Sequence, residues 1–136
     1  MNKNPILFAD FIPGVVMGQC LQVYDEAQAQ RWQAIFGIDV EAPDNGAAQA
    51  ASMAIVGMMH AYLDVVSPRP PGNVHAKQKF TIHDLPKLGE AMRITVKCES
   101  KEERRSRKYL QLRVSGIEDK QQRPLFDGLL TLIWAA

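Results

Sequence analysis

The chain has 136 residues, the usual length of one domain, and we expect residues 1–136 to form a single domain. Its formal net charge of +1 gives no electrostatic reason to expect binding to nucleic acid or to an anionic membrane. Apolar residues make up 46% of the chain and charged residues 23%, as in an ordinary globular protein.

The two cysteines, Cys20 and Cys98, lie in strand-like runs and form no CxxC pair. The sequence therefore carries no zinc or redox motif, and we expect two buried free thiols in a reducing compartment. The apolar run before Asp10 is too short for the core of a signal peptide. These features favour a cytoplasmic protein.

Residues 14–24 are typical of a first strand, and the helix predicted after them has a clear signal at each end. Asp25 is a good N-cap, and Gln28 stands where a capping box places its second member. Gly37 is placed to end the helix in a left-handed turn. Helical spacing predicts one apolar face, made by Trp32, Ile35 and Phe36.

Residues 38–46 are predicted to form a loop, interrupted by Pro43 and the Asn45–Gly46 pair. A helix over about residues 47–66 follows, with no charged residue before Asp64. It approaches the length of a membrane span, but it is built from Ala, Gly and Met and lacks an aromatic belt or a basic flank. A helix that is apolar on all sides is otherwise one buried in the middle of a domain, and we predict that position.

Four strands are predicted after this helix, over residues 73–82, 92–99, 110–115 and 125–136. The second and third alternate apolar and polar residues, which is typical of strands with one buried face. The last is apolar on nearly both faces, which indicates a central strand or one that faces a partner subunit. In the first, alternation puts four apolar residues on one face, with Gln78 interrupting them: Val74, Ala76, Phe80 and Ile82.

The order of elements predicts an α+β protein, in which an antiparallel sheet carries helices on one face. The apolar face of that sheet must be covered. We expect the uncharged helix to cover it, with the sheet curled about the helix.

Several local patterns resemble the MaoC-like branch of the hotdog fold, the dehydratases and (R)-specific enoyl-CoA hydratases. The resemblance covers about residues 13–134. The first pattern is a Gly-led strand, an acidic helix start and a closing Phe-Gly, in "PGVVMGQCLQVYDEAQAQRWQAIFGID". The second is a "VH" pair, a strand and a turn with Pro and Gly, in "GNVHAKQKFTIHDLPKLGE", where Glu90 replaces the usual Asp. The resemblance implies a hotdog fold, a curled antiparallel sheet around a long central helix.

The hydratases of this family usually carry Asp-x-Asn-Pro-x-His before the central helix, and its Asp and His hold and activate a water. Asp39 fits the Asp position and Pro43 stands one residue late, but no His occurs from residue 38 to 59. The dyad is therefore incomplete. The candidate catalytic residues are Asp39 and, as a replacement in space, His60. Asp39 could equally cap the turn after the first helix, and a His in a buried helix most often makes one internal hydrogen bond.

Other residues have a structural reading first. Asp44 and Asn45 are turn formers, His75 matches a mostly structural position of the family, and His83 is predicted to be solvated. Three methionines are predicted as core rather than as the lining of an acyl tunnel: Met53, Met58 and Met59. The run "KEERRSRK" reads as a solvated turn. Contact with the phosphates of coenzyme A or of a carrier protein is the alternative, and nucleic acid is disfavoured because no aromatic residues are interleaved.

The resemblance implies a protein that handles acyl thioesters, of coenzyme A or of an acyl carrier protein, as a hydro-lyase (a 3-hydroxyacyl thioester dehydratase or enoyl-CoA hydratase). It implies no metal and no redox cofactor, and at least a homodimer, because such folds cover an open sheet edge by pairing subunits. Two alternatives stay open. One is a thioesterase that uses Asp39, Asp44 or Asp64, and the other is a non-catalytic acyl-CoA-binding or partner subunit.

Overall fold

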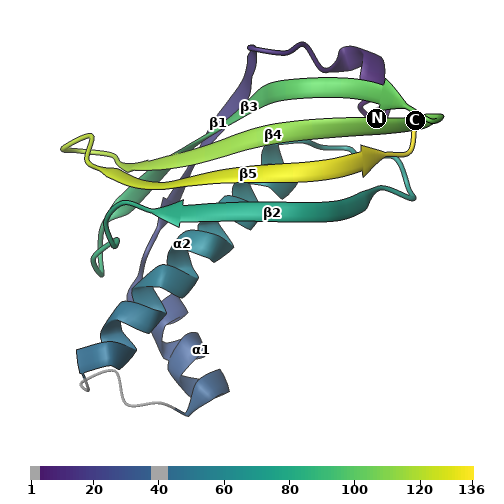
Figure 1. Ribbon diagram of the computed structural model, residues 1–136. Coiled ribbons are helices and arrows are strands. Elements are labelled where there is room, and N and C mark those ends of the chain that lie inside the picture. Colours follow the sequence, from purple (N-terminus) through teal and green to yellow (C-terminus); the bar gives the residue numbers. More distant parts are fainter. Residues whose placement is uncertain (1–3, 38–42) are drawn as a thin grey trace.

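The computed structural model describes residues 4–37 and 43–136 of the chain, which form one curved sheet with two helices (Figure 1). The elements in chain order are η1 Phe8–Asp10, β1 Val16–Val23, α1 Glu26–Phe36, α2 Pro43–Val65, β2 Val74–Ile82, β3 Ala91–Arg104, β4 Arg107–Glu118 and β5 Pro124–Trp134. No helix among these residues is long and apolar enough to cross a membrane.

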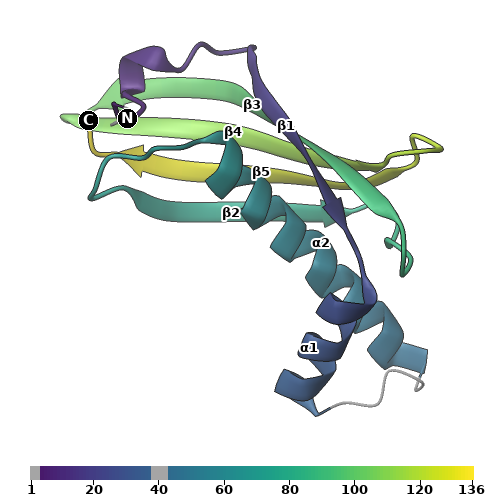
Figure 2. The same ribbon diagram turned by 180° about the vertical axis from the view of Figure 1, so that it is seen from behind.

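The sheet is antiparallel with the strand order β1-β3-β4-β5-β2, so β1 and β2 are its edges and β5 is an interior strand. Both helices lie on one side of it (Figure 2). The C-terminal half of α2 crosses the sheet, while its N-terminal half projects past the sheet edge with α1 beside it. The predicted α+β architecture is confirmed.

The ends of α1 are those that the sequence predicted. The Asp25 side chain accepts a hydrogen bond from the Gln28 backbone N–H, and Gly37 ends the helix with φ of 63°. The predicted apolar face is only partly confirmed. Trp32 is 7% exposed, whereas Ile35 is 76% and Phe36 57% exposed. Only the Trp32 side of the predicted face is therefore buried, and the last turn of α1 is exposed.

Helix α2 begins at Pro43, several residues before the predicted start. Proline is well placed in a first helical turn, because its missing N–H has no partner there in any case. The prediction that Pro43 and the Asn45–Gly46 pair interrupt regular structure is therefore wrong.

The core lies between the C-terminal half of α2 and the inner face of the sheet. Small residues let the two layers approach. A Cβ at Gly128 of β5 would collide with Met58 of α2, and a Cβ at Gly57 would lie 3.0 Å from Met92 of β3. The predicted burial of α2 on all sides is wrong, because Ile55, at 39% exposure, belongs to a flank that no described part of the chain covers.

The segment before β1 closes one end of this core. The indole N–H of Trp134, near the C-terminus, donates to the carbonyl of Ile6 at 2.8 Å, and its ring meets Phe11 edge-on at 4.9 Å. Phe11 and Trp134 are both nearly fully buried. The two ends of the chain therefore meet at the same end of the sheet, as Figure 1 shows.

A β-bulge in β2 changes which side chains share a face. His75 pairs with Leu132 and Lys77 with Thr131, so Ala76 is an extra residue. Residues directly opposite in an antiparallel pair point to the same face, so His75 shares the inner face with Leu132. The predicted face is confirmed for Phe80 and Ile82 and wrong for Val74 and Ala76: the inner face of β2 holds His75, Gln78, Phe80 and Ile82.

The charged run "KEERRSRK" turns the chain and is exposed over residues 102–107, as predicted, but the turn itself is shorter than expected. Strands β3 and β4 continue to Arg104 and from Arg107, and only Arg105 and Ser106 form the loop. Both have positive φ, 52° and 64°, as a type I′ hairpin turn requires. The run is the tip of a long hairpin.

The turn before β3 is held by an ion-pair cluster. Both terminal nitrogens of Arg123 donate to the Glu90 carboxylate, at 2.7 and 3.0 Å, and Arg123 Nε lies 2.7 Å from Asp84 Oδ2. These hydrogen bonds from Arg123 hold the pKa of Glu90 below its usual value, against the opposing effect of burial. The backbone N–H of Tyr24 donates to the Glu90 carbonyl, which ties the cluster to the start of α1.

Candidate functional site

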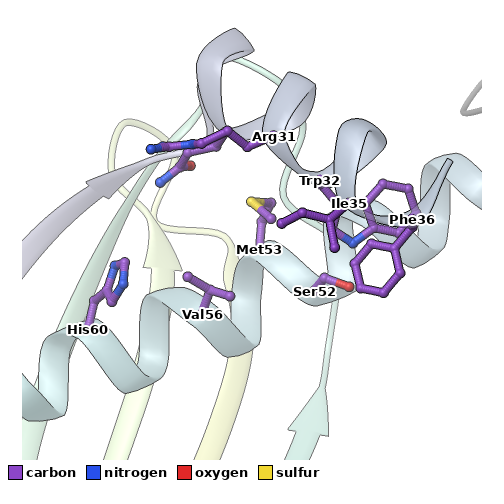
Figure 3. Close-up of a pocket in the computed structure, with 9 residues that line it drawn as sticks. Arg31, Trp32, Ile35, Phe36, Ser52, Met53, Val56 and His60 are labelled. Carbon is purple, nitrogen blue, oxygen red and sulfur yellow. The ribbon is translucent and has the colours of Figure 1, made fainter. Parts of the chain in front are cut away.

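A cavity of about 390 Å³ lies between α1 and the N-terminal half of α2, outside the sheet (Figure 3). It is open on one side, and its lining is mostly apolar. Nine side chains line it: Gln28, Arg31, Trp32, Ile35, Phe36, Ser52, Met53, Val56 and His60.

The α1 wall follows from helical spacing. Gln28, Arg31, Trp32 and Ile35 stand at i, i+3, i+4 and i+7 and therefore share one face of the helix. Trp32 is the buried floor of this wall, and Arg31 is exposed. The high exposure of Ile35 is explained here, since it borders the open side of the cavity.

The α2 wall has the same origin. Ser52, Val56 and His60 recur every four residues along the helix, and Met53 lies beside them, 8% exposed. In Figure 3, His60 and the Arg31 guanidinium lie toward one end of the cavity, and Phe36 and Ser52 toward the other. The arrangement is an apolar groove with its positively charged group at one end.

Buried polar contacts fix the spacing of the two walls. The Tyr24 hydroxyl donates to Gln49 Oε1, and Gln49 Nε2 donates to the carbonyl of Ala29 at 3.2 Å. Gln49 is only 4% exposed. Burial, with a smaller effect of Glu26, raises the pKa of Tyr24, so its hydroxyl remains a donor at neutral pH. This chain of contacts joins the end of β1, α2 and α1.

Two polar groups of the lining could form a hydrogen bond or an ion pair with a ligand. The indole N–H of Trp32 is buried and has no hydrogen-bond partner among the described residues. A buried donor without a partner costs free energy, and an acceptor atom of a ligand would remove that cost. Arg31 carries a permanent positive charge suited to a phosphate or a carboxylate.

The structure places His60 on the cavity wall, not in the core. It is exposed, and within residues 4–37 and 43–136 it makes no hydrogen bond, so the reading of His60 as a buried, internally bonded histidine is wrong. Asp39, the other predicted catalytic residue, lies outside the described residues. The side chain of Asp44 is likewise outside them. The predicted pair of Asp39 and His60 therefore stays a prediction.

The remaining candidate residues differ in burial and in whether they line the cavity. Met58 is fully buried and Met59 packs on the same core, as predicted, whereas Met53 is both buried and part of the cavity lining. His83 is exposed, as expected, and His75 is exposed on the edge strand. Neither lines the cavity.

Asp64 is exposed and also lies outside the cavity lining. Both cysteines are free. Cys98 is fully buried and Cys20 half-buried, and burial raises the pKa of both thiols. In the described part of the chain, no cluster of His, Cys, Asp or Glu is arranged to hold a metal ion.

Sequence reasoning missed Arg31, Trp32 and Ser52 as site residues. The signal that could have found Arg31 is its place on the face of Gln28, Trp32 and Ile35. Arg31 carries a charge directly beside Trp32, which packs inward.

Comparison with known proteins extends this description. No protein-family model matches the sequence, and a search of curated proteins found no match. Among solved structures, the chain is similar to the MaoC-like dehydratase from Rhodospirillum rubrum, with a TM-score of 0.76, 10% identity, and 96% of this chain and 98% of that chain covered.

It is also similar to R-hydratase PhaJ1 from Pseudomonas aeruginosa, with a TM-score of 0.71, 16% identity, and 93% and 84% of the two chains covered. The HadBC (3R-hydroxyacyl-ACP dehydratase) complex from Mycobacterium tuberculosis gives a TM-score of 0.67 at 16% identity, covering 90% of this chain and 96% of that chain. At these identities the likeness shows the fold. The chain therefore has the hotdog fold, in the form found in MaoC-like dehydratases and R-hydratases.

Proposed function

We propose that this protein binds an acyl thioester of coenzyme A or of an acyl carrier protein, with the acyl chain in the cavity between α1 and α2. The observation that carries the proposal is an apolar cavity of about 390 Å³ with Arg31 and His60 among its lining residues. An acyl chain gains roughly 0.8 kcal/mol for each CH₂ that it buries in such a site. The fold is shared with proteins named as hydratases and dehydratases.

The ends of the cavity suit the two ends of such a ligand. Phe36 and Ser52 line one end, where an acyl tail could stop. Arg31 and His60 line the other end. The thioester and the phosphates of coenzyme A or phosphopantetheine would lie toward Arg31. The unpartnered indole N–H of Trp32 would donate to a ligand oxygen.

We propose hydration and dehydration as the chemistry. Water adds across the double bond of a 2-enoyl thioester when a base takes a proton from the water and an acid delivers one to C2. His60 is the one imidazole of the described lining, and no carboxylate lines that part of the cavity. Asp39 is the proposed second group. These proton transfers need neither a metal nor a redox cofactor.

The thioesterase alternative needs a carboxylate at the thioester carbonyl. Asp64 lies outside the cavity lining, so this reading depends on Asp39 or Asp44 alone. In the non-catalytic alternative, the protein binds the acyl thioester but does not convert it. Pairing with another chain is compatible with all three readings, and two structural neighbours, HadBC and ChsH1-ChsH2 from Mycobacterium tuberculosis, are complexes. The predicted homodimer is one form of that pair.

Two measurements test the proposal. Isothermal titration with saturated acyl-CoAs of increasing length is expected to show tighter binding for longer chains until the cavity is full. Val56→Trp fills the middle of the cavity from a helix surface position and should abolish that gain. Leu88→Trp, an exposed position outside the cavity, is the matched control and should keep it. Equal affinity of both variants and wild type would refute binding in this cavity.

Mass spectrometry of products separates the three readings. Incubation with 2-enoyl-CoA should give a gain of one water, lost in Asp39→Asn and in His60→Gln but kept in His83→Gln. Release of free coenzyme A would instead establish a thioesterase. Binding without any turnover would establish the non-catalytic role.

A further inference from the structure

The two tryptophans of the chain differ in whether their indole N–H groups have hydrogen-bond partners. Trp134 donates to the carbonyl of Ile6 at 2.8 Å. Trp32 is 7% exposed, and its N–H is buried without a partner among the described residues. Native proteins leave few buried donors unpaired, and each one costs free energy unless a ligand or a water supplies the acceptor. Because Trp32 lines the cavity, its unpaired N–H points to a ligand with an acceptor atom.

The donor lies toward the end of the cavity that is far from the positive charge. The Trp32 ring packs against the Phe36 ring, with 4.9 Å between their centroids. In Figure 3 the indole nitrogen lies on the side of Phe36 and Ser52. The Arg31 guanidinium and His60 lie toward the other end, where the proposed function places the thioester. The indole N–H would therefore meet the distal part of the acyl chain rather than the thioester or a phosphate.

The side chains of the described lining do not supply the missing acceptor. Gln28 and Ser52 carry oxygens and Met53 a sulfur, yet the Trp32 N–H donates to none of them. The Ser52 hydroxyl is turned to its own helix, where it donates to the carbonyl of Ala48 at 2.8 Å. A saturated acyl tail has no acceptor either, so it would fill the cavity and leave the N–H unpaired.

Access to the donor depends on Phe36. Its ring packs on Trp32 but is 57% exposed, and Phe36 is the last residue of α1. A small rotation of this ring loses little buried apolar area, so a ligand oxygen can reach the N–H from the cavity. Because the donor is already buried in the free protein, only the ligand oxygen is desolvated on binding. The hydrogen bond therefore contributes more than one formed between two hydrated groups.

The surroundings of the N–H also restrict the kind of oxygen. No described side chain at this end of the cavity carries a positive charge, so a carboxylate would be buried without a counter-ion. A hydroxyl would bring a hydrogen that needs an acceptor of its own. A ketone oxygen accepts from the indole N–H and needs no further partner, so it fits this end best.

We propose that Trp32 is a specificity-determining residue, which selects acyl thioesters that carry a ketone on the distal half of the acyl chain. The indole N–H donates to the ketone oxygen, and the rest of the chain fills the apolar cavity. A site that hydrogen-bonds a group of the substrate discriminates against the analogue that lacks it. The inference rests on the proposed function and deepens it, because it names the class of acyl group.

Isothermal titration compares octanoyl-CoA with its 4-oxo, 5-oxo, 6-oxo and 7-oxo derivatives. Wild type should bind at least one oxo ligand about tenfold tighter than octanoyl-CoA. In Trp32→Phe this ratio of affinities should fall to about one or below, since a buried ketone without a donor is unfavourable. The ratio is the readout, so a general loss of affinity in the variant does not affect it. Trp134→Phe makes the same change at the indole outside the cavity and should keep the wild-type ratio.

The indole N–H signals give a second readout that needs no variant at the site. A ¹H–¹⁵N spectrum has one indole signal for each of the two tryptophans, and Trp134→Phe identifies which is which. The favoured oxo ligand should shift the Trp32 signal downfield of its position with octanoyl-CoA, because the proton enters a hydrogen bond. The Trp134 signal should be the same with both ligands.

The outcomes separate this inference from the proposed function. If octanoyl-CoA binds and every oxo ligand binds no tighter, the inference is overturned and the proposed function stands. The same holds for a preference that Trp32→Phe retains, and for a Trp32 signal that is the same with both ligands. If no acyl-CoA binds, the proposed function fails and the inference fails with it.

Discussion

The hydroxyl of Tyr24 donates a hydrogen bond to the side-chain oxygen of Gln49, and this contact ties the end of β1 to α2 beneath the proposed site. Tyr24→Phe removes the donor and leaves the buried Gln49 Oε1 without its hydrogen bond from the Tyr24 hydroxyl. We expect a loss of about 1–3 kcal/mol in the free energy of unfolding, measured by urea denaturation. Tyr109→Phe is the control, because its hydroxyl has no hydrogen bond within the described chain, and it should change little. Equal losses in the two variants would contradict the role of this contact.

The ion pair of Glu90 and Arg123 predicts a pH dependence of stability. The folded state lowers the pKa of Glu90, so its contribution is complete above the ordinary pKa of a glutamate and is lost as the pH falls through the lowered value. Glu90→Gln should therefore be less stable than wild type at pH 7, and the gap should narrow in acid. Urea denaturation across that range measures it. At pH 7, the exposed Glu103→Gln should stay within about 0.5 kcal/mol of wild type, and a Glu90→Gln gap that is independent of pH would refute the argument.

The tip of the β3–β4 hairpin holds two residues with positive φ, neither of them glycine. Asn and Gly adopt these angles with less strain, so Arg105→Asn/Ser106→Gly should raise the free energy of unfolding by about 0.5–1 kcal/mol. Ser115→Gly, inside β4, adds a glycine where the backbone is extended and should lower it. Thermal unfolding of both variants gives the comparison, and a destabilised hairpin variant would contradict the turn geometry.

Close approach of α2 to β5 depends on Gly128. A methyl group at this position would collide with the fully buried Met58, so Gly128→Ala should cost about 1–3 kcal/mol. Met58→Ala alone opens a cavity and also destabilises. In the double variant the two losses should partly cancel, because the added methyl enters the vacated space. Strictly additive losses in a double-mutant cycle would show that the two residues do not compete for space.

Features set by neighbouring residues could be predicted from the sequence. Asp25 and Gly37 bound α1 as predicted, because a cap is a contact within one turn of helix. The alternation in β3 and β4 was sufficient to predict a sheet with one buried face. The bulge at Ala76 could not be predicted in this way. The order of apolar and polar residues in β2 does not mark which residue is the extra one, and only the pairing of β2 with β5 reveals it.

The candidate site shows the same limit. His60 was singled out as a titratable residue in an apolar helix, but its exposure depends on α1 lying over only the first half of α2. The uncharged sequence of α2 was read as burial on all sides. An exposed apolar flank, such as that of Ile55, has the same composition as one that the sheet covers, so the sequence alone does not separate the two cases.

Arg31 offers a sharp test of how the proposed ligand lies. If the guanidinium contacts phosphates of coenzyme A, Arg31→Gln should weaken the binding of an acyl-CoA by about tenfold, the value of one charge-assisted contact. The same acyl group on pantetheine, which has no phosphate, should bind wild type and variant equally. Isothermal titration of both ligands makes the comparison, with Arg107→Gln as the control, an exposed arginine outside the cavity. An equal loss with both ligands would place the Arg31 contact on the acyl group, the thioester or the pantetheine arm instead, because these parts are common to the two ligands.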